Sequence, residues 1–229
     1  MTTIAKALQA VQARILQAAT QCGRDPQGIA LIAVSKTVDP ATLRLAQAAG
    51  QHVFGESYVQ EALPKIAALS DLAIEWHFIG PLQSNKTKSV AENFAWVHSV
   101  ERAKIAQRLS EQRPEGLPAL NVCLQVNVSG EASKSGVLPT ELPALAQAVA
   151  TLPNIRLRGL MAIPEATDDV AKQHAQFRLL RTLRDDLNAQ GLALDTLSMG
   201  MSGDLEAAIA EGATLVRVGS AIFGAREKA

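Results

Sequence analysis

Hydrophobic positions along the chain follow two alternating periods. Near the N-terminus, Leu8, Val11 and Ile15 recur at steps of three and four residues, which is the period of an amphipathic helix. Residues 29–35 then form a short and largely apolar run, which is typical of a buried strand. The same succession of a short apolar run and a longer amphipathic stretch continues toward the C-terminus.

Seven further runs predict strands after the first one. They are His52–Phe54, Ile74–Ile79, Ala95–Val97, Leu120–Val128, Leu157–Ile163, Leu194–Met199 and Thr214–Val218. After the helix at residues 4–19, the amphipathic stretches predict a helix that begins near Pro40 and helices at Val59–Ala68, Lys86–Glu92, Arg102–Gln112, Glu141–Ala150, Val170–Gln190 and Leu205–Ala210.

Strands that are separated by helices of this length run parallel, and eight such units favour an α/β fold with a single (β/α)8 TIM barrel. The helix before the first strand is an addition to that barrel. A doubly wound open sheet is the alternative. No linker divides the chain, so we expect residues 1–229 to form one domain. With 48% hydrophobic and only 3% aromatic residues, its core is expected to be aliphatic.

Composition narrows the possible partners. The 22 Lys and Arg residues balance the 22 Asp and Glu residues, so we expect neither nucleic acid nor a membrane surface as a partner. No apolar run has the length of a membrane span, and the N-terminus lacks the apolar stretch of a signal peptide. We interpret the two cysteines, Cys22 and Cys123, as free thiols of a cytoplasmic protein. The histidines show no metal-ligand spacing, so no metal site is expected.

Candidate chemistry begins at the end of the first strand. Alternation places Ile32, Val34 and Lys36 on one face. If this face fills the barrel, Lys36 points into its C-terminal mouth, where partial desolvation lowers the pKa of its amine and makes it a nucleophile. The alternatives are that Lys36 extends to solvent at a strand end, or that Lys134, in a polar loop, is the reactive amine.

The last two strands supply the other candidates. Arg217 shares a strand face with Gly219, and a buried arginine requires a partner. Gly219 and Ser220 follow the eighth strand, and Ser202 and Gly203 follow the seventh. These two loops form the usual phosphate site of such barrels, although each could be an ordinary turn. The set fits a phosphate-bearing aldehyde: either pyridoxal 5′-phosphate (PLP) or the substrate of a sugar-phosphate aldolase.

Two further residues are candidates for the lining of a cofactor site. His77 lies in the middle of the third strand, where a hydrogen-bonded core histidine is the alternative, and Met199 ends the seventh strand. Tyr58, the only tyrosine, could serve as an acid or base but is better interpreted as a packing residue.

Several segments together resemble the pyridoxal phosphate homeostasis protein family. They are residues 31–37 (LIAVSKT), 54–56 (FGE), 76–86 (WHFIGPLQSNK), 126–127 (VN), 159–161 (GLM), 197–202 (LSMGMS) and 216–224 (VRVGSAIFG). The resemblance covers nearly the whole length. It implies a fold-type III PLP barrel similar to the barrel domain of alanine racemase.

The resemblance also implies roles. Lys36 would form the Schiff base with PLP, Arg217 would face the pyridine nitrogen, and Ser202, Gly219 and Ser220 would hold the phosphate. Ser57 departs from the family, which usually has asparagine there. Because an arginine at the ring nitrogen weakens PLP as an electron sink, we expect a PLP carrier or buffer with no catalytic residues, in preference to an amino-acid racemase. Apo PLP-dependent enzymes would be the recipients, and the resemblance favours a monomer.

Overall fold

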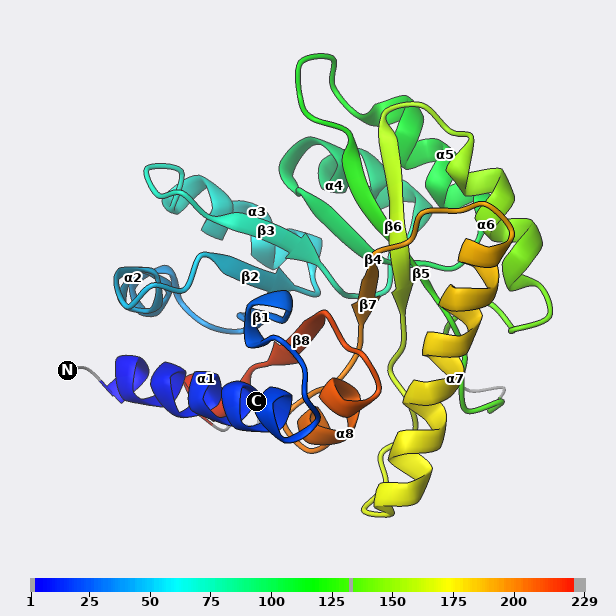
Figure 1. The fold of residues 1–229 in the computed structure, drawn as a ribbon. Helices are drawn as coiled ribbons and strands as arrows, with labels where there is room; N and C mark the ends of the chain where they lie inside the picture. Colours follow the sequence, from blue (N-terminus) through cyan, green and yellow to red (C-terminus); the bar gives the residue numbers. More distant parts are fainter. Residues whose placement is uncertain (1–2, 132–133, 225–229) are drawn as a thin grey trace.

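The computed structural model describes residues 3–131 and 134–224. Parallel strands pair in the order β1 to β8 and close into a barrel, so the predicted (β/α)8 fold is confirmed and the open sheet is wrong (Figure 1). The strands are β1 (Ala30–Val34), β2 (Val53–Glu56), β3 (Glu75–Phe78), β4 (Trp96–Val100), β5 (Leu120–Gln125), β6 (Ile155–Met161), β7 (Thr196–Ser198) and β8 (Leu215–Val218).

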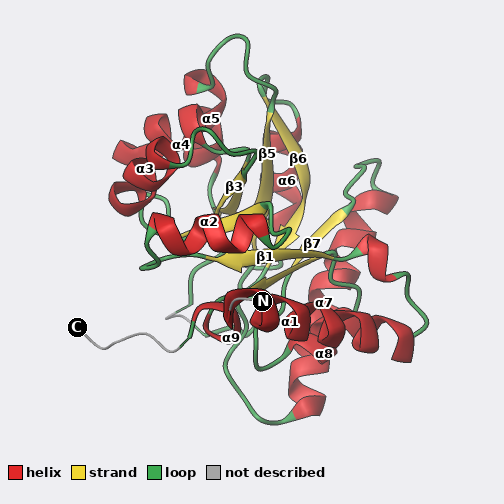
Figure 2. Cartoon of the chain, turned by 90° about the vertical axis from the view of Figure 1, so that its left-hand side faces the viewer, coloured by secondary structure: helices red, strands yellow, loops and turns green. Residues whose placement is uncertain are grey.

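Helices surround this barrel, and the predicted extra helix precedes the first strand. They are α1 (Thr3–Gln21), α2 (Pro40–Ala48), α3 (Val59–Ala68), α4 (Thr87–Asn93), α5 (Ala103–Gln112), α6 (Leu142–Ala150), α7 (Val170–Ala189), α8 (Leu205–Ala210) and α9 (Ser220–Phe223), with short 3₁₀ turns η1 (Pro26–Gly28) and η2 (Ser84–Lys86). Figure 2 shows α1 beside α8 and α9, which it contacts. Its predicted apolar face is the buried one.

The apolar residues form two layers, as strand alternation requires. Most of them pack between the barrel wall and the helices. A smaller cluster fills part of the barrel interior and consists of Ile32, Trp96, Cys123, Met161 and Leu215. Ile32 and Leu215 therefore point inward, so the β1 face that carries Ile32, Val34 and Lys36 is the one that fills the barrel.

Several predicted strand ends differ from the observed ones: β4 extends three residues further, to Val100, β2 extends two further, to Glu56, and β5, β6 and β7 end earlier than predicted. Local turns explain the ends of β5 and β7. β5 ends at Gln125 instead of Val128, because the Asn127 side chain organises a turn by donating to Glu131 O at 2.8 Å and accepting from Gly130 N at 3.0 Å. β7 ends at Ser198 instead of Met199, because Gly200, with a φ of 94°, turns the chain away from the extended path, and it begins at Thr196 instead of Leu194.

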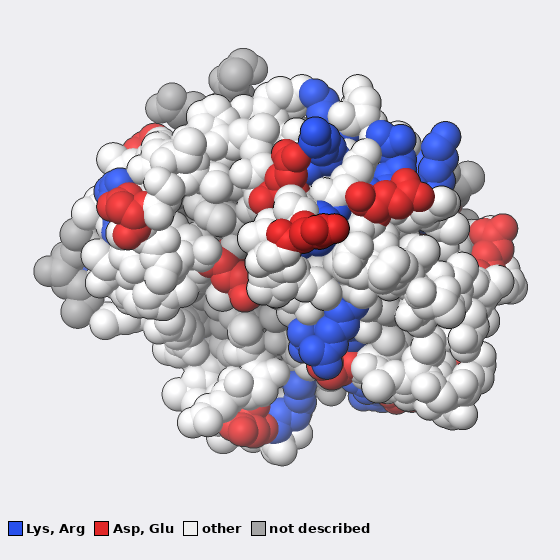
Figure 3. All heavy atoms as spheres, turned by 90° about the horizontal axis from the view of Figure 1, so that it is seen from above, with Lys and Arg blue, Asp and Glu red and all other residues white. Residues whose placement is uncertain are grey.

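The surface charges are mixed on the face that is shown, and the two cysteines are not bonded to each other. On the face in Figure 3, basic and acidic side chains are interspersed and form no large patch of one sign. Within the described ranges no helix has both the length and the apolar character needed to cross a membrane. Cys22 and Cys123 are free thiols, one exposed and one buried.

Candidate functional site

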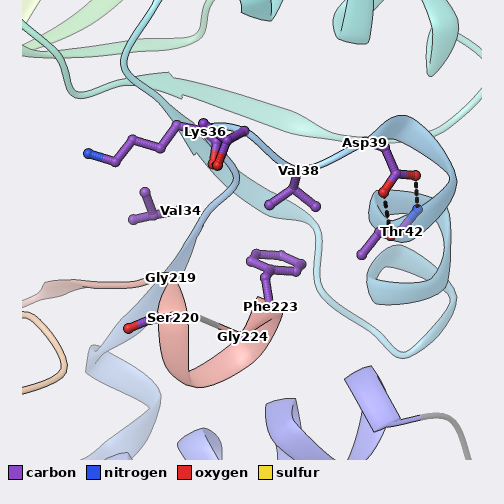
Figure 4. Close-up of a pocket in the computed structure, with 10 residues that line it drawn as sticks. Val34, Lys36, Val38, Asp39, Thr42, Gly219, Ser220, Phe223 and Gly224 are labelled. Atoms are coloured by element: carbon purple, nitrogen blue, oxygen red, sulfur yellow. Dashed lines mark hydrogen bonds between the residues drawn. The ribbon is translucent and has the colours of Figure 1, made fainter. Parts of the chain in front are cut away.

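A cavity of about 360 Å³ opens where β1 and β8 end. The two strands are neighbours in the closed barrel, with Ile32 paired to Arg217 and Ala33 to Val218. The residues that follow them therefore meet, although they lie far apart in the sequence. The cavity is lined by Val34, Lys36, Thr37, Val38, Asp39, Thr42, Gly219, Ser220, Phe223 and Gly224 (Figure 4).

Lys36 is half-buried in the turn that follows β1. In Figure 4 its side chain, the Ser220 hydroxyl and the Val34 side chain point to the same side of the strand pair, whereas Phe223 lies on the other side. The Asp39 carboxylate caps α2, accepting from Thr42 N at 2.9 Å and from Thr42 Oγ1 at 2.7 Å. Lys36 and Ser220 thus place their polar groups on the same side of the two strands.

The turn that carries Lys36 has an unusual backbone. Thr37 adopts a φ of 68°, in the left-handed region that a β-branched residue rarely occupies. The Glu61 carboxylate accepts a hydrogen bond from Thr37 N, and Thr37 Oγ1 donates to Lys36 O at 2.6 Å. Contacts from α3 therefore hold the turn, and with it the position of the Lys36 backbone.

A buried charged group beneath this turn, the Lys65 cluster, consists of Ser35, Glu56, Glu61 and Lys65. Lys65 Nζ donates to Ser35 O at 2.8 Å, Glu56 Oε1 at 2.9 Å and Glu61 Oε1 at 2.8 Å. The Lys65 side chain is 7% exposed and that of Glu56 is fully buried. The cluster therefore ties α3 and β2 to the residue that precedes Lys36.

Glu56 accepts one further hydrogen bond within the cluster. Ser35 Oγ donates to Glu56 Oε1 at 2.6 Å, while Glu56 Oε2 has no partner among the described residues. Burial raises the pKa of this carboxyl, and the hydrogen bond from Ser35 and the charge of Lys65 oppose that rise.

Arg217 lies inside the barrel, below the cavity. Its Nη1 donates to Ser198 O at 2.7 Å and to Ser198 Oγ at 2.8 Å, and its Nη2 donates to Ala162 O at 2.8 Å. All three acceptors are neutral. Burial lowers the pKa of Arg217 to about 10, so the guanidinium stays charged at neutral pH. Arg217 is thus partnered by the Ser198 hydroxyl and two backbone carbonyls, and no carboxylate among the described residues contacts it.

Hydrogen bonds continue from Ser198 across the barrel interior. His98 Nδ1 lies 2.7 Å from Ser198 Oγ, and His98 Nε2 lies 2.9 Å from His77 Nδ1. His77 Nε2 in turn lies 2.8 Å from Glu75 Oε1, whose side chain is half exposed at the start of β3. We call Glu75, His77, His98 and Ser198 the interior relay. His77 is therefore a hydrogen-bonded interior residue that does not line the cavity beside Lys36.

The remaining candidates lie apart from that cavity. Ser202 and Gly203 form the turn after β7, and Gly203 lines a second cavity beside Cys22. Met199 is fully buried in the layer between barrel and helices, on the opposite strand face from Ser198. Neither Ser202 nor Met199 lines the cavity beside Lys36.

Tyr58 and Lys134, whose roles the sequence did not decide, line other cavities. Tyr58 is 53% exposed and lines a cavity with Gln83 and Lys86. Lys134 lines a polar hollow beside Glu101. In the described structure neither is among the residues that surround Lys36.

Sequence reasoning missed the Lys65 cluster and the role of His98 and Ser198. The i,i+4 spacing of Glu61 and Lys65 is a signal for an ion pair on one helix, but it does not indicate burial. His98 lies 100 positions before Ser198, so no local pattern joins them.

The chain matches a family model and several known proteins. The family model of the alanine racemase N-terminal domain matches residues 7–227. The pyridoxal phosphate homeostasis protein of Pseudomonas aeruginosa is 66% identical over 227 residues, which cover 99% of this chain and 97% of the relative. That of Escherichia coli K12 is 51% identical and covers 99% of this chain and 98% of the relative. The chain belongs to the pyridoxal phosphate homeostasis protein family.

Solved structures extend the comparison within and beyond this family. PipY of Synechococcus elongatus PCC7942, solved with PLP bound, has a TM-score of 0.85 and 39% identity, and the match covers 96% of this chain and 100% of PipY. Alanine racemase of Corynebacterium glutamicum has a TM-score of 0.70 at 17% identity, covering 96% of this chain and 60% of the racemase. The racemase shares the barrel fold.

Proposed function

We propose that this family member binds PLP as a Schiff base on Lys36 and serves as a carrier or buffer of PLP. The observation that carries the proposal is the cavity between β1 and β8, in which Lys36 and Ser220 point to the same side. A primary amine and a phosphate-binding group on one wall suit an aldehyde that carries a phosphate. PipY, which is 39% identical, was solved with PLP bound.

The residues present fit such a group at both ends. For the phosphate, Ser220 offers a hydroxyl, and Gly219 lets the β8 backbone approach β1, since a Cβ there would lie only 3.2 Å from Val34 O. For the pyridine nitrogen, Arg217 is the proposed donor. Its bonds within the described chain use three of its five N–H groups, so two are left for a ligand. Ser202 and Gly203 do not line the cavity, but they follow β7, which pairs with β8, and we propose them for additional contacts to the phosphate.

A carrier is favoured over a racemase by what surrounds Lys36. When bound, PLP supplies an electron sink for carbanions, and that sink is strong only when the ring nitrogen is protonated. Arg217 donates and has no acceptor, so it stabilises the neutral ring nitrogen. Among the described lining residues, the only ionisable side chain besides Lys36 is Asp39, which caps α2. We therefore assign no catalytic residue.

The wider role follows from the same proposal. Apo PLP-dependent enzymes are the proposed recipients of the cofactor, and the chain is proposed to act as a monomer. A cytoplasmic location accords with the two free thiols, Cys22 and Cys123.

The test is reduction of the PLP-loaded protein with borohydride, followed by peptide mapping. We expect the label on Lys36, and we expect Lys36→Ala to lose the visible absorbance of the Schiff base. Lys134→Ala is the matched control and should keep both. Labelling of Lys134 in the wild-type chain, or a full absorbance band in Lys36→Ala, would refute the assignment.

A further inference from the structure

The interior relay runs without a break from Arg217 to a carboxylate at the opposite end of the barrel. Each link is between 2.7 and 2.9 Å long: Arg217 to Ser198, Ser198 to His98, His98 to His77 and His77 to Glu75. His77 and His98 are both buried, whereas the Glu75 side chain is half exposed. The relay therefore connects Arg217, the proposed donor to the ring nitrogen, with the half-exposed Glu75 carboxylate at the start of β3.

Its two ends determine the direction of every hydrogen bond. The Arg217 guanidinium can only donate, so Ser198 Oγ accepts from it, and the one described acceptor for the Ser198 hydroxyl is His98 Nδ1. At the other end, the hydrogen bond from His77 lowers the pKa of Glu75. The Glu75 carboxylate is thus ionised at neutral pH and can only accept.

Between these ends both imidazoles must be neutral and protonated on Nε2. His98 accepts from Ser198 at Nδ1 and donates to His77 at Nε2, and His77 repeats this pattern toward Glu75. These tautomers follow because Arg217 can only donate and the Glu75 carboxylate can only accept. Burial, the largest cause, lowers the pKa of His77 and that of His98, which agrees with neutral rings.

Other charged groups lie around the relay. The Arg158 guanidinium stacks 4.8 Å above the Trp96 ring, which is itself parallel to His77, and Arg158 also pairs with Asp195. Near Arg217, the charge of Asp204 acts on the guanidinium from the loop after β7. These groups act on the relay from β4, β6 and β7 but form no link in it.

We propose that Glu75, His77, His98 and Ser198 are positioning residues that aim Arg217 at the ring nitrogen of the bound cofactor. The inference rests on the proposed function. A carboxylate beside Arg217 would occupy its donors in a bidentate pair. The relay instead places the countercharge at its distant end and gives Arg217 a neutral hydroxyl, which fixes the side chain and leaves donors for the ligand.

The decisive probe is an analogue of PLP with carbon in place of the ring nitrogen, because it removes the one acceptor that Arg217 would meet. In the wild-type chain, loss of this charge-assisted bond should weaken binding at least about tenfold relative to PLP. In His98→Leu, the Ser198 hydroxyl loses its acceptor and Arg217 loses its alignment. The ratio of the two dissociation constants should then fall to about one.

Two further variants keep the test open if His98→Leu fails to fold. His98→Gln retains one acceptor and one donor and should restore the wild-type preference for PLP over the analogue. Glu75→Gln, at a half-exposed site, should reduce that preference, whereas Glu92→Gln, the exposed control in a surface pair with Lys88, should not. Side-chain ¹⁵N NMR of the apo protein should show His77 and His98 as neutral Nε2–H tautomers.

Each outcome separates the two proposals. If His98→Leu and Glu75→Gln keep the full preference for PLP, or if NMR shows an Nδ1–H tautomer of His98, the relay does not act through Arg217. If His98→Gln is as deficient as His98→Leu, the hydrogen bonds are not what matters and the inference is overturned. If borohydride does not fix PLP to Lys36 of the wild-type chain, the proposed function fails, while the NMR tautomers still test the relay.

Discussion

Lys65→Met isolates the Lys65 cluster from any question about the cofactor. Methionine matches the volume of the lysine stem but removes the ammonium that bonds Glu56, Glu61 and Ser35 O. Glu61 is partly exposed and can regain water, whereas the Glu56 side chain is fully buried. After the substitution the Glu56 carboxylate keeps one described donor, the Ser35 hydroxyl, and becomes a buried charge without a counterion.

Protonation of Glu56 limits the cost of that buried charge. Its ordinary pKa is 4.5, which is 2.5 pH units below pH 7, so neutralising it on folding costs at most about 3.4 kcal/mol at about 1.36 kcal/mol per unit. The lost bond to Ser35 O adds about 1 kcal/mol. We therefore expect Lys65→Met to lower the free energy of unfolding by about 2–4 kcal/mol at pH 7.

The same reasoning gives the pH dependence its sign. A carboxyl whose pKa is raised in the folded state stabilises the protein below its unfolded pKa, and this contribution is lost as the pH rises through the folded value. Lys65→Met raises the pKa of Glu56 further. Its penalty should therefore shrink at pH 5, where the charge part is at most about 0.7 kcal/mol.

Urea unfolding of the apo protein, followed by circular dichroism at pH 5 and pH 7, measures both quantities. The double variant Lys65→Met with Glu56→Gln should recover part of the loss, because the uncompensated charge is gone. Lys88→Met, in the exposed Lys88–Glu92 pair, is the control and should change stability by less than about 0.5 kcal/mol. A penalty for Lys65→Met that is equal at both pH values, or a double variant less stable than the single one, would refute the reasoning.

Four further outcomes are expected. Ser220→Ala should weaken the binding of PLP more than that of pyridoxal, by at least about tenfold, because one charge-assisted hydrogen bond to the phosphate is lost. The same titration of Ser202→Ala tests the loop after β7. Equal losses for both ligands would mean that the serines support only the fold. Burial keeps the pKa of His98 well below 6.5, so the unfolded chain alone takes up a proton there and stability should fall as pH drops below 6.5. Replacing His98 by Phe should flatten this slope in urea titrations by up to about 1.4 kcal/mol per pH unit. Gly159→Ala should lower the melting temperature sharply, since its Cβ would lie 1.8 Å from Thr196 O on the next strand, and an unchanged melting temperature would contradict the close packing of these strands. Finally, α-deuterium exchange of L-amino acids should be near the rate with free PLP, and a ten-thousand-fold acceleration, about 5.4 kcal/mol, would favour the racemase.

The fold was predictable because the hydrophobic residues of strands and helices recur with different periods, and each β/α unit contains one strand and one helix. Alternation placed Lys36 on the face of Ile32 and Arg217 on the face of Gly219, and the barrel shows that Ile32 fills the interior. Closure of the barrel then brings Lys36 and Ser220 to one cavity, which no local pattern indicates. Strand ends were less predictable, since a side chain such as Asn127 ends β5 through turn contacts that apolar periodicity does not record.

The site was predictable where it depended on strand phase and not where it depended on contacts across the barrel. Arg217 was expected to be buried with a partner, but Ser198 as that partner required the pairing of β7 with β8. The same phase argument separates Met199 from Ser198, because adjacent strand residues face opposite layers. The links from Ser198 to His98 and from His98 to His77 join three strands, so only the folded barrel reveals them.

The chemistry of the barrel interior bears on the choice between holding a cofactor and activating it. A buried arginine is most simply balanced by an adjacent carboxylate, but such a pair would use the donors that a ligand needs. In this chain Arg217 contacts neutral acceptors, and the ionised Glu75 lies at the other end of the relay. An arginine held in this way binds the neutral form of a ring nitrogen firmly and disfavours its protonation, since it has no acceptor to offer. Firm binding without a strong electron sink is what a carrier requires, and in our proposal the relay maintains both conditions.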